Sequence, residues 1–200
     1  MKNVILLLLF AISLNGFSQT KIGFKAGVGL ATISTNDDEL NAEKTSFFTP
    51  QFGIVLQSKI SSSLSVQTQL LYSNKGTAES HDDHKDYVKF SSLDLPVQFL
   101  FESKNGLVLG AGPNVGFNLS AHHLHDDEKE AIEIGKESGE VKRLDLGLNI
   151  TGGYQSKKGW AVNVTYLRGL TNLQNVPNFT WNNNLLSFGF TYFLKGTKKK

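Results

Sequence analysis

Apolar residues alternate with small or polar residues along eight segments of the chain between Lys21 and Gly196. A period of two is typical of β-strands, because successive side chains of a strand point to opposite faces. The second face of each segment consists mainly of Gly, Asn, Gln, Ser and Thr. The pattern predicts eight strands whose apolar positions run, in steps of two, over Ile22–Leu30, Phe48–Leu56, Leu64–Tyr72, Leu93–Phe101, Leu107–Phe117, Leu144–Tyr154, Trp160–Tyr166 and Leu186–Leu194.

The absence of charge on the apolar face indicates which solvent that face meets. A Lys or Arg on the lipid side of a barrel costs about 2–4 kcal/mol at the membrane midplane, whereas a solvated strand accepts charge freely. We therefore expect an all-β protein, an eight-stranded antiparallel up-and-down transmembrane β-barrel with OmpA/OmpX-like architecture. A soluble lipocalin-like barrel is the main alternative fold. The small glycines and few charges on the polar face favour the membrane barrel.

Short and long connections alternate between the predicted strands. Tight turns are expected at Ser58–Ser63, Glu102–Asn105 and Gln155–Lys158, and long, polar, irregular loops at Ser34–Phe47, Lys75–Asp86, Ser120–Val141 and Thr171–Asn184. Outer-membrane barrels have short periplasmic turns and long extracellular loops. The alternation therefore places both termini in the periplasm and the four long connections outside the cell.

The first eighteen residues predict a signal peptide. Lys2 is followed by an apolar run over Val4–Leu14, and Gly16 and Ser18 are small residues at the −3 and −1 positions of the cleavage site. We expect residues 1–18 to be removed, residues 19–196 to form an outer-membrane barrel domain, and residues 197–200 to be a basic periplasmic tail. The apolar run is too short to be a spanning helix.

A barrel of eight strands encloses an interior that side chains fill. We therefore expect a plugged lumen without a wide pore. Lys25, Asp94, Arg143 and Asp145 are predicted to form an ion-pair network there, since a charge in a narrow interior needs a partner. A path for protons or ions along these residues is the alternative.

Composition excludes several classes of function. The chain has no cysteine, which excludes a disulfide framework, a thiolate nucleophile and a lipoprotein anchor. The net charge of +2 gives no reason to expect a nucleic-acid partner. The mean hydropathy of −0.19 does not exclude a membrane, because barrels alternate their lipid-facing residues with polar ones.

All five histidines fall in two of the predicted outer loops, beside acidic residues. His81 and His84 lie in the second loop, and His122, His123 and His125 lie in the third. Imidazole and carboxylate groups together can bind Zn²⁺, Ni²⁺ or Cu²⁺, so these five residues are the candidate metal ligands. Hydrated loop residues are the alternative interpretation. No resident cofactor is expected.

Ser120 beside His122 allows an enzymatic alternative. A hydroxyl and an imidazole that act together are the machinery of nucleophilic acyl transfer, and small barrel enzymes that act on lipid A use such groups. We expect no enzyme here, because Ser120 and His122 are ordinary polar loop residues in this sequence.

Several strings resemble the PorT-like outer-membrane barrel family of Bacteroidetes. They are Lys21–Leu30, Leu93–Leu100 with its Asp-Leu-Pro, Gly110–Gly116, Tyr166–Asn172 and the aromatic strand Ser187–Leu194. The resemblance implies an eight-stranded barrel, and most members have no assigned role. Because the founding member is linked to type IX secretion, the resemblance also raises an accessory role in secretion.

Taken together, the sequence predicts a small, non-enzymatic integral protein of the outer membrane. Its long outer loops would carry a structural or interaction role, and the protein would be a monomer. The expected partners are outer-membrane lipid, lipopolysaccharide and other envelope proteins. The alternatives are an accessory of envelope assembly or type IX secretion, and a surface protein that binds divalent metal or modifies lipid.

Overall fold

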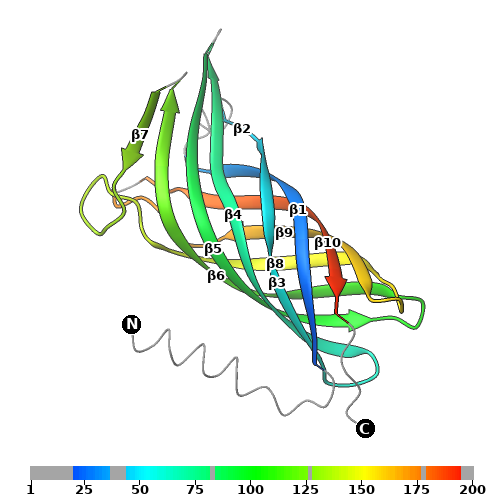
Figure 1. Cartoon of the computed structure of the whole chain (residues 1–200). Coiled ribbons are helices and arrows are strands. Elements are labelled where there is room, and N and C mark those ends of the chain that lie inside the picture. The colour runs from blue at the N-terminus through cyan, green and yellow to red at the C-terminus, as the bar shows by residue number, and fades with distance from the viewer. Residues whose placement is uncertain (1–19, 37–43, 82–83, 126–127, 177–178, 195–200) are drawn as a thin grey trace.

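Eight long antiparallel strands close into a barrel in the computed structural model, which describes residues 20–36, 44–81, 84–125, 128–176 and 179–194 (Figure 1). The barrel closes because β1 pairs with β10 and β4 pairs with β5. This confirms the predicted fold. The barrel strands are β1 (Thr20–Ser34), β3 (Phe47–Lys59), β4 (Leu64–His81), β5 (His84–Glu102), β6 (Leu107–His125), β8 (Leu144–Gln155), β9 (Trp160–Gly169) and β10 (Asn182–Phe193).

Two short strands complete the sheet outside the barrel wall. β2 (Lys44–Thr45) pairs with β4, and β7 (Glu128–Ile132) pairs with β6. Within the described residues, no helix is long and apolar enough to span a membrane. The predicted signal peptide at 1–18 and the basic tail at 197–200 lie outside the described residues, so both stay predictions.

The two faces of the barrel wall follow the alternation in the sequence. Large apolar side chains point outward and stay exposed, with Phe24 56%, Ile150 65% and Phe188 64% accessible. The inward positions between them are buried and mostly Gln, Asn, Ser and Thr. Apolar surface this extensive has no water-compatible arrangement, so lipid must cover it.

The three predicted tight turns are confirmed at one end of the barrel. Four residues each separate β3 from β4, β5 from β6, and β8 from β9. Gly106 and Gly159 adopt φ values of 91° and 92° in two of these turns. Other residue types rarely adopt this conformation, so the glycines fix both turns.

Two of the predicted outer loops are wrong, because the chain there forms paired strands. β4 continues to His81 and β5 starts at His84, so the segment Lys75–Asp86 is mostly a β-hairpin. In the segment Ser120–Val141, β6 continues to His125 and turns back as β7. We call residues 74–81, 84–91 and 120–125 with β2 and β7 the outer sheet. It rises beyond the rest of the barrel in Figure 1.

The remaining long connections are closer to their predictions. β1 extends to Ser34, and the connection to β3 contains the two-residue β2. Of the loop predicted at Thr171–Asn184, the described residues 171–176 and 179–181 lie outside the strands, and β10 begins at Asn182, two residues inside the predicted loop.

A β-bulge in β6 changes the face on which the following residues lie. Ser91 pairs with Ser120, but Ser92 pairs with Asn118, which leaves Leu119 as the extra residue. An extra residue in a strand moves every later side chain to the opposite face. Asn118 therefore points into the barrel, and Ala121 does so as well, although they are three residues apart.

An apolar cluster lies where the outer sheet joins the barrel, above the polar interior. Its members come from strands and from the irregular outer segments, and Phe90 stacks edge-to-face with Trp181 at 6.5 Å. This cluster secures the outer sheet to the barrel by burial of apolar surface. The buried members are Ile33, Val88, Phe90, Ala121, Val141 and Leu173, and Ile132, Ile134 and Trp181 pack against them.

Candidate functional site in the lumen and the outer sheet

A buried lysine between two carboxylates occupies the barrel interior. Lys75 Nζ lies 2.7 Å from Asp94 Oδ1 and 3.0 Å from Asp145 Oδ2, and the Lys75 side chain is fully buried. Each carboxylate accepts a further hydrogen bond: Ser73 Oγ donates to Asp94 at 2.6 Å, and Asn183 Nδ2 donates to Asp145 Oδ2 at 3.1 Å, while Asp145 Oδ1 has no partner among the described residues. A buried carboxylate needs such partners because its desolvation is costly.

The predicted lumenal network is correct for the two aspartates and wrong for its cations. Arg143 is exposed and lies outside the network. Lys25 is buried, but its Nζ donates to Gln69 and not to either aspartate. Lys75, which the sequence places in an outer loop, is the cation instead, because β4 is longer than predicted and carries Lys75 inward.

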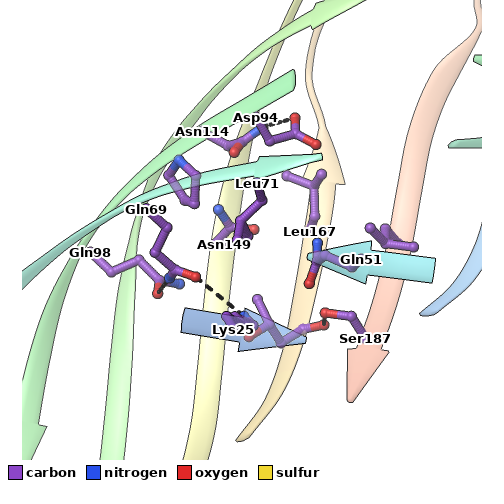
Figure 2. A pocket seen from close by; sticks show the side chains of 13 residues that line it. Lys25, Gln51, Gln69, Leu71, Asp94, Gln98, Asn114, Asn149, Leu167 and Ser187 are labelled. Carbon is purple, nitrogen blue, oxygen red and sulfur yellow. Dashed lines mark hydrogen bonds between the residues drawn. The ribbon is translucent and has the colours of Figure 1, made fainter. Parts of the chain in front are cut away.

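Lys25 lies lower in the interior, beside a small cavity (Figure 2). Its Nζ donates to Gln69 Oε1 at 3.3 Å, and Gln69 Nε2 donates to Gln98 Oε1 at 3.0 Å. The cavity measures about 20 Å³, which suffices for about one water molecule. Side chains therefore fill this part of the lumen, as expected for eight strands.

The candidate histidines lie on paired strands of the outer sheet, where register fixes their faces. On β6, His123 and His125 share one face and His122 lies on the other. His123 pairs with Val88 of β5 and His125 with Asp86, while His122 pairs with Lys89. Val88 belongs to the apolar cluster, so His123 and His125 lie on the face that continues the barrel interior. His81 pairs with His84 at the end of the β4–β5 hairpin.

A side-chain hydrogen bond joins β5 and β6 on this inner face of the outer sheet. His125 Nδ1 lies 2.5 Å from Asp86 Oδ1, and the His125 side chain is 58% exposed. A carboxylate bound to Nδ1 fixes the tautomer in which Nδ1 carries the proton. In the neutral ring, Nε2 is then the nitrogen with a lone pair.

Register places charges of opposite sign on the two faces of β7. Glu130 occupies the inner face opposite His123, and Lys129 occupies the outer face. Partial burial and the nearby Lys129 ammonium both lower the pKa of His122. This effect of Lys129 agrees with a shared outer face for the two residues.

The candidate serine and histidine do not form a nucleophilic pair. Ser120 pairs with Ser91, and His122 pairs with Lys89 two residues further along β6. Two residues on one strand are about 7 Å apart, and the hydrogen bonds of the described residues include none between Ser120 and His122. Nor do three or more His, Asp or Glu side chains in the described part of the chain converge as a ready metal site.

The comparison with protein families identifies the barrel. The model of the outer membrane protein beta-barrel domain matches residues 17–175, well over half of the chain. The chain belongs to this family. It is therefore an outer-membrane β-barrel protein, as predicted. The finer assignment to the PorT-like group of Bacteroidetes stays a prediction.

Solved structures of outer-membrane barrels share the fold. Neisserial surface protein A is 13% identical, with a TM-score of 0.58, over 88% of this chain and 99% of that chain. Ail of Yersinia pestis (11%, TM-score 0.48, 88% and 99%) and OprG of Pseudomonas aeruginosa (11%, TM-score 0.43, 90% and 99%) also match. At these identities the likeness concerns the fold. No curated protein matches the chain.

Sequence reasoning missed two features of this outer-membrane barrel. Lys75 was not recognised as lumenal, although it continues the inward positions Leu71 and Ser73 in steps of two. The separation of His122 from His123 and His125 was also missed. The alternation of Val88 and Phe90 marks the inner face of β5, but the sequence does not show that His123 pairs with Val88.

Proposed function

We propose that this outer-membrane barrel is a non-enzymatic surface protein that interacts with its surroundings through the outer sheet. The proposal rests on the lengths of β4, β5 and β6, which exceed what is needed to cross a membrane. A tilted strand crosses a membrane with about 9–11 residues, and β9 has 10. β4, β5 and β6 have 18, 19 and 19 residues. The excess of roughly eight residues corresponds to about 26 Å of strand beyond the membrane.

The continuous strand pairing of the outer sheet supports an interaction role. β4 and β5 pair without interruption from Asn74, opposite Ser91, to His81, opposite His84. The apolar cluster anchors the base of the outer sheet. A rigid element loses less conformational entropy on binding than a flexible loop does. Its far edge, β7, presents a short polar strand with exposed Lys129 and Glu130.

The proposal includes the immediate partners of the barrel. The exposed apolar belt meets outer-membrane lipid, with lipopolysaccharide around the outer rim. Since the barrel closes on itself, all eight wall strands have both neighbours, which favours a monomer. The filled lumen favours a role that needs no conduction.

A role in envelope assembly or secretion would need contact surfaces on the periplasmic side. The described connections on that side are the three four-residue turns, which offer little surface area for contact with a partner. Other envelope proteins remain candidate partners of the outer sheet. The geometry therefore favours interaction at the cell surface over an accessory role beneath the membrane.

Shortened variants test the proposal in a strain that lacks the native gene. One variant replaces residues 77–88 and 122–131 by Asn-Gly turns, which suit the paired ends Gly76–Lys89 and Ala121–Ile132. The matched control replaces turn residues 60–63 by a Gly-Ser sequence of the same length. Heat-modifiable gel mobility confirms that each barrel folds.

The readouts are surface adhesion or autoaggregation of cells, and resistance to detergent. We expect the variant without the outer sheet to lose the surface phenotype, and the turn variant to keep it. Full complementation by the variant without the outer sheet, with failure of the turn variant, would contradict the proposal and support the envelope-assembly alternative.

A further inference from the structure

We propose that His123, His125 and Glu130 form a surface site for a divalent transition-metal ion, with Asp86 as the residue that orients His125. The inference rests on the observed strand pairing and on the Asp86–His125 contact, and it is independent of the interaction role proposed above. It selects His123 and His125 from the five candidate histidines and excludes His122, which lies on the opposite face of β6.

The first step is the position of the two histidines on one strand. β6 runs unbroken from Ser120 to His125, so His123 and His125 project from the same face. Their Cα atoms are about 7 Å apart at the rise of a β-strand. Two imidazoles at this spacing can both reach one ion, because each ring extends several ångströms from its Cα atom. His122 projects from the opposite face and cannot join them.

The second step is the orientation of His125. Asp86 Oδ1 lies 2.5 Å from Nδ1 across the β5–β6 pair. Metal-bound histidines commonly donate their second ring N–H to a carboxylate, which fixes the ring and raises its basicity. Here the carboxylate is already in place, and the His125 side chain is 58% exposed. With Nδ1 held by Asp86, Nε2 is the nitrogen that would bind an ion from solution.

The third step is a carboxylate ligand across the next strand pair. Glu130 pairs directly with His123, and the Cβ atoms of such pairs lie about 4.5–5.5 Å apart. Glu130 is exposed, so its side chain can rotate toward the ion at little cost. Among the described residues the three ligands do not yet converge, and binding would bring them together by rotation of side chains at the surface.

The ligand set indicates the class of ion. Two imidazole nitrogens and one carboxylate suit Zn²⁺, Ni²⁺ or Cu²⁺, whereas Mg²⁺ and Ca²⁺ prefer oxygen ligands alone. Three protein ligands leave a fourth position of a tetrahedral ion for water. Lys129, which neighbours Glu130 on β7, lies on the opposite face and does not repel the ion there.

Titration of the full-length mature chain with ZnCl₂ tests the site. For this titration the chain is prepared without a polyhistidine tag and folded in detergent. Isothermal titration calorimetry then measures the affinity and stoichiometry of Zn²⁺ binding. We expect one saturable Zn²⁺ per barrel and no saturable heat with MgCl₂. The variants H123A, H125A and E130Q should each weaken Zn²⁺ binding by about tenfold or more.

His122→Ala is the matched control, because it removes a histidine of the same strand from the opposite face. We expect this variant to bind Zn²⁺ as the native chain does. Circular dichroism and heat-modifiable mobility verify the fold of every variant, and H125Q replaces H125A if that variant misfolds. The absence of saturable Zn²⁺ binding to the native chain would overturn the inference, as would an equal loss in H122A.

Discussion

At the scale of single residues, the buried ion pairs of the lumen show how the interior tolerates charge. Lys75 is flanked by Asp94 and Asp145, and each carboxylate has further hydrogen-bond donors. When one partner of such a group is removed, the remaining charge is left buried without compensation. Lys75 is therefore more important for stability than its position near the end of the apolar pattern suggests.

The first prediction concerns this triad. Lys75→Met should lower the free energy of unfolding by about 3–5 kcal/mol, because two buried carboxylates lose their cation. Urea-induced unfolding of the barrel in detergent micelles measures the change. The triple variant K75M/D94N/D145N should recover most of the loss. Lys25→Met is the control with a smaller expected effect, since Lys25 Nζ donates to the neutral Gln69. A K75M variant as stable as K25M would contradict this account.

The second prediction concerns Asp86 as a positioning residue. Asp86→Asn should weaken Zn²⁺ binding about 10–100-fold, the usual effect of losing a carboxylate that orients a metal-bound histidine. ¹⁵N NMR of the imidazole should show that His125 loses its preference for the Nδ1–H tautomer in this variant. Unchanged affinity together with an unchanged tautomer would show that the Asp86–His125 contact does not prepare the site.

At the scale of elements, strands with a continuous apolar face can be predicted from the sequence. Strand segments that lack such a face cannot. Lipid imposes a strict alternation on the lower barrel, so its strands and turns follow from the sequence. In the outer sheet, Lys85–Lys89 and His122–His125 consist mainly of charged residues and histidines, and no apolar face runs along either segment. These segments therefore resemble irregular loops, although their backbones pair continuously.

The bulge at Leu119 explains why the histidine faces were not predictable. Steps of two from Phe117 would place Ala121 and His123 on the outward face, but the extra residue in β6 reverses the faces beyond it. A bulge has no reliable signal in a single sequence.

In the buried group of Lys75, Asp94 and Asp145, the sequence predicts the positions of the two aspartates but not that of the lysine. Asp94 and Asp145 lie within predicted strands, on the face opposite the apolar positions, so their inward direction follows from the alternation. Lys75 lies past Tyr72, the last apolar position of its predicted strand. The apolar pattern therefore gives no reason to extend the strand as far as Lys75, although steps of two from Ser73 place Lys75 on the inward face.

The third prediction concerns the anchor of the outer sheet. Phe90→Ala should leave a cavity in the apolar cluster and destabilise the outer sheet by about 3–5 kcal/mol. Hydrogen exchange should then accelerate at amides of residues 76–81 and 84–89, while amides of β9 and β10 keep their protection. Phe48→Ala is the control, because Phe48 is 78% exposed on the lipid face. Uniform acceleration over the whole barrel in F90A would show that the outer sheet is not a separate unit of stability.

At the scale of the whole molecule, the chain is a closed barrel with a paired sheet above one end. Buried side chains line the described interior, the three tight turns lie at the opposite end, and the exposed apolar belt lies between. Residues available to outside partners therefore lie on the outer sheet and on the irregular segments beside it. The central claim is that this sheet faces the cell exterior.

Labelling of single cysteines on intact cells tests that claim most directly, since the native chain contains no cysteine. Ala131→Cys places a thiol on the exposed outer sheet, and Lys157→Cys places one in the turn between β8 and β9. A membrane-impermeant maleimide should label A131C on intact cells and K157C only after the outer membrane is permeabilised. Labelling of K157C on intact cells, with A131C protected, would contradict the orientation and with it the proposed role of the outer sheet.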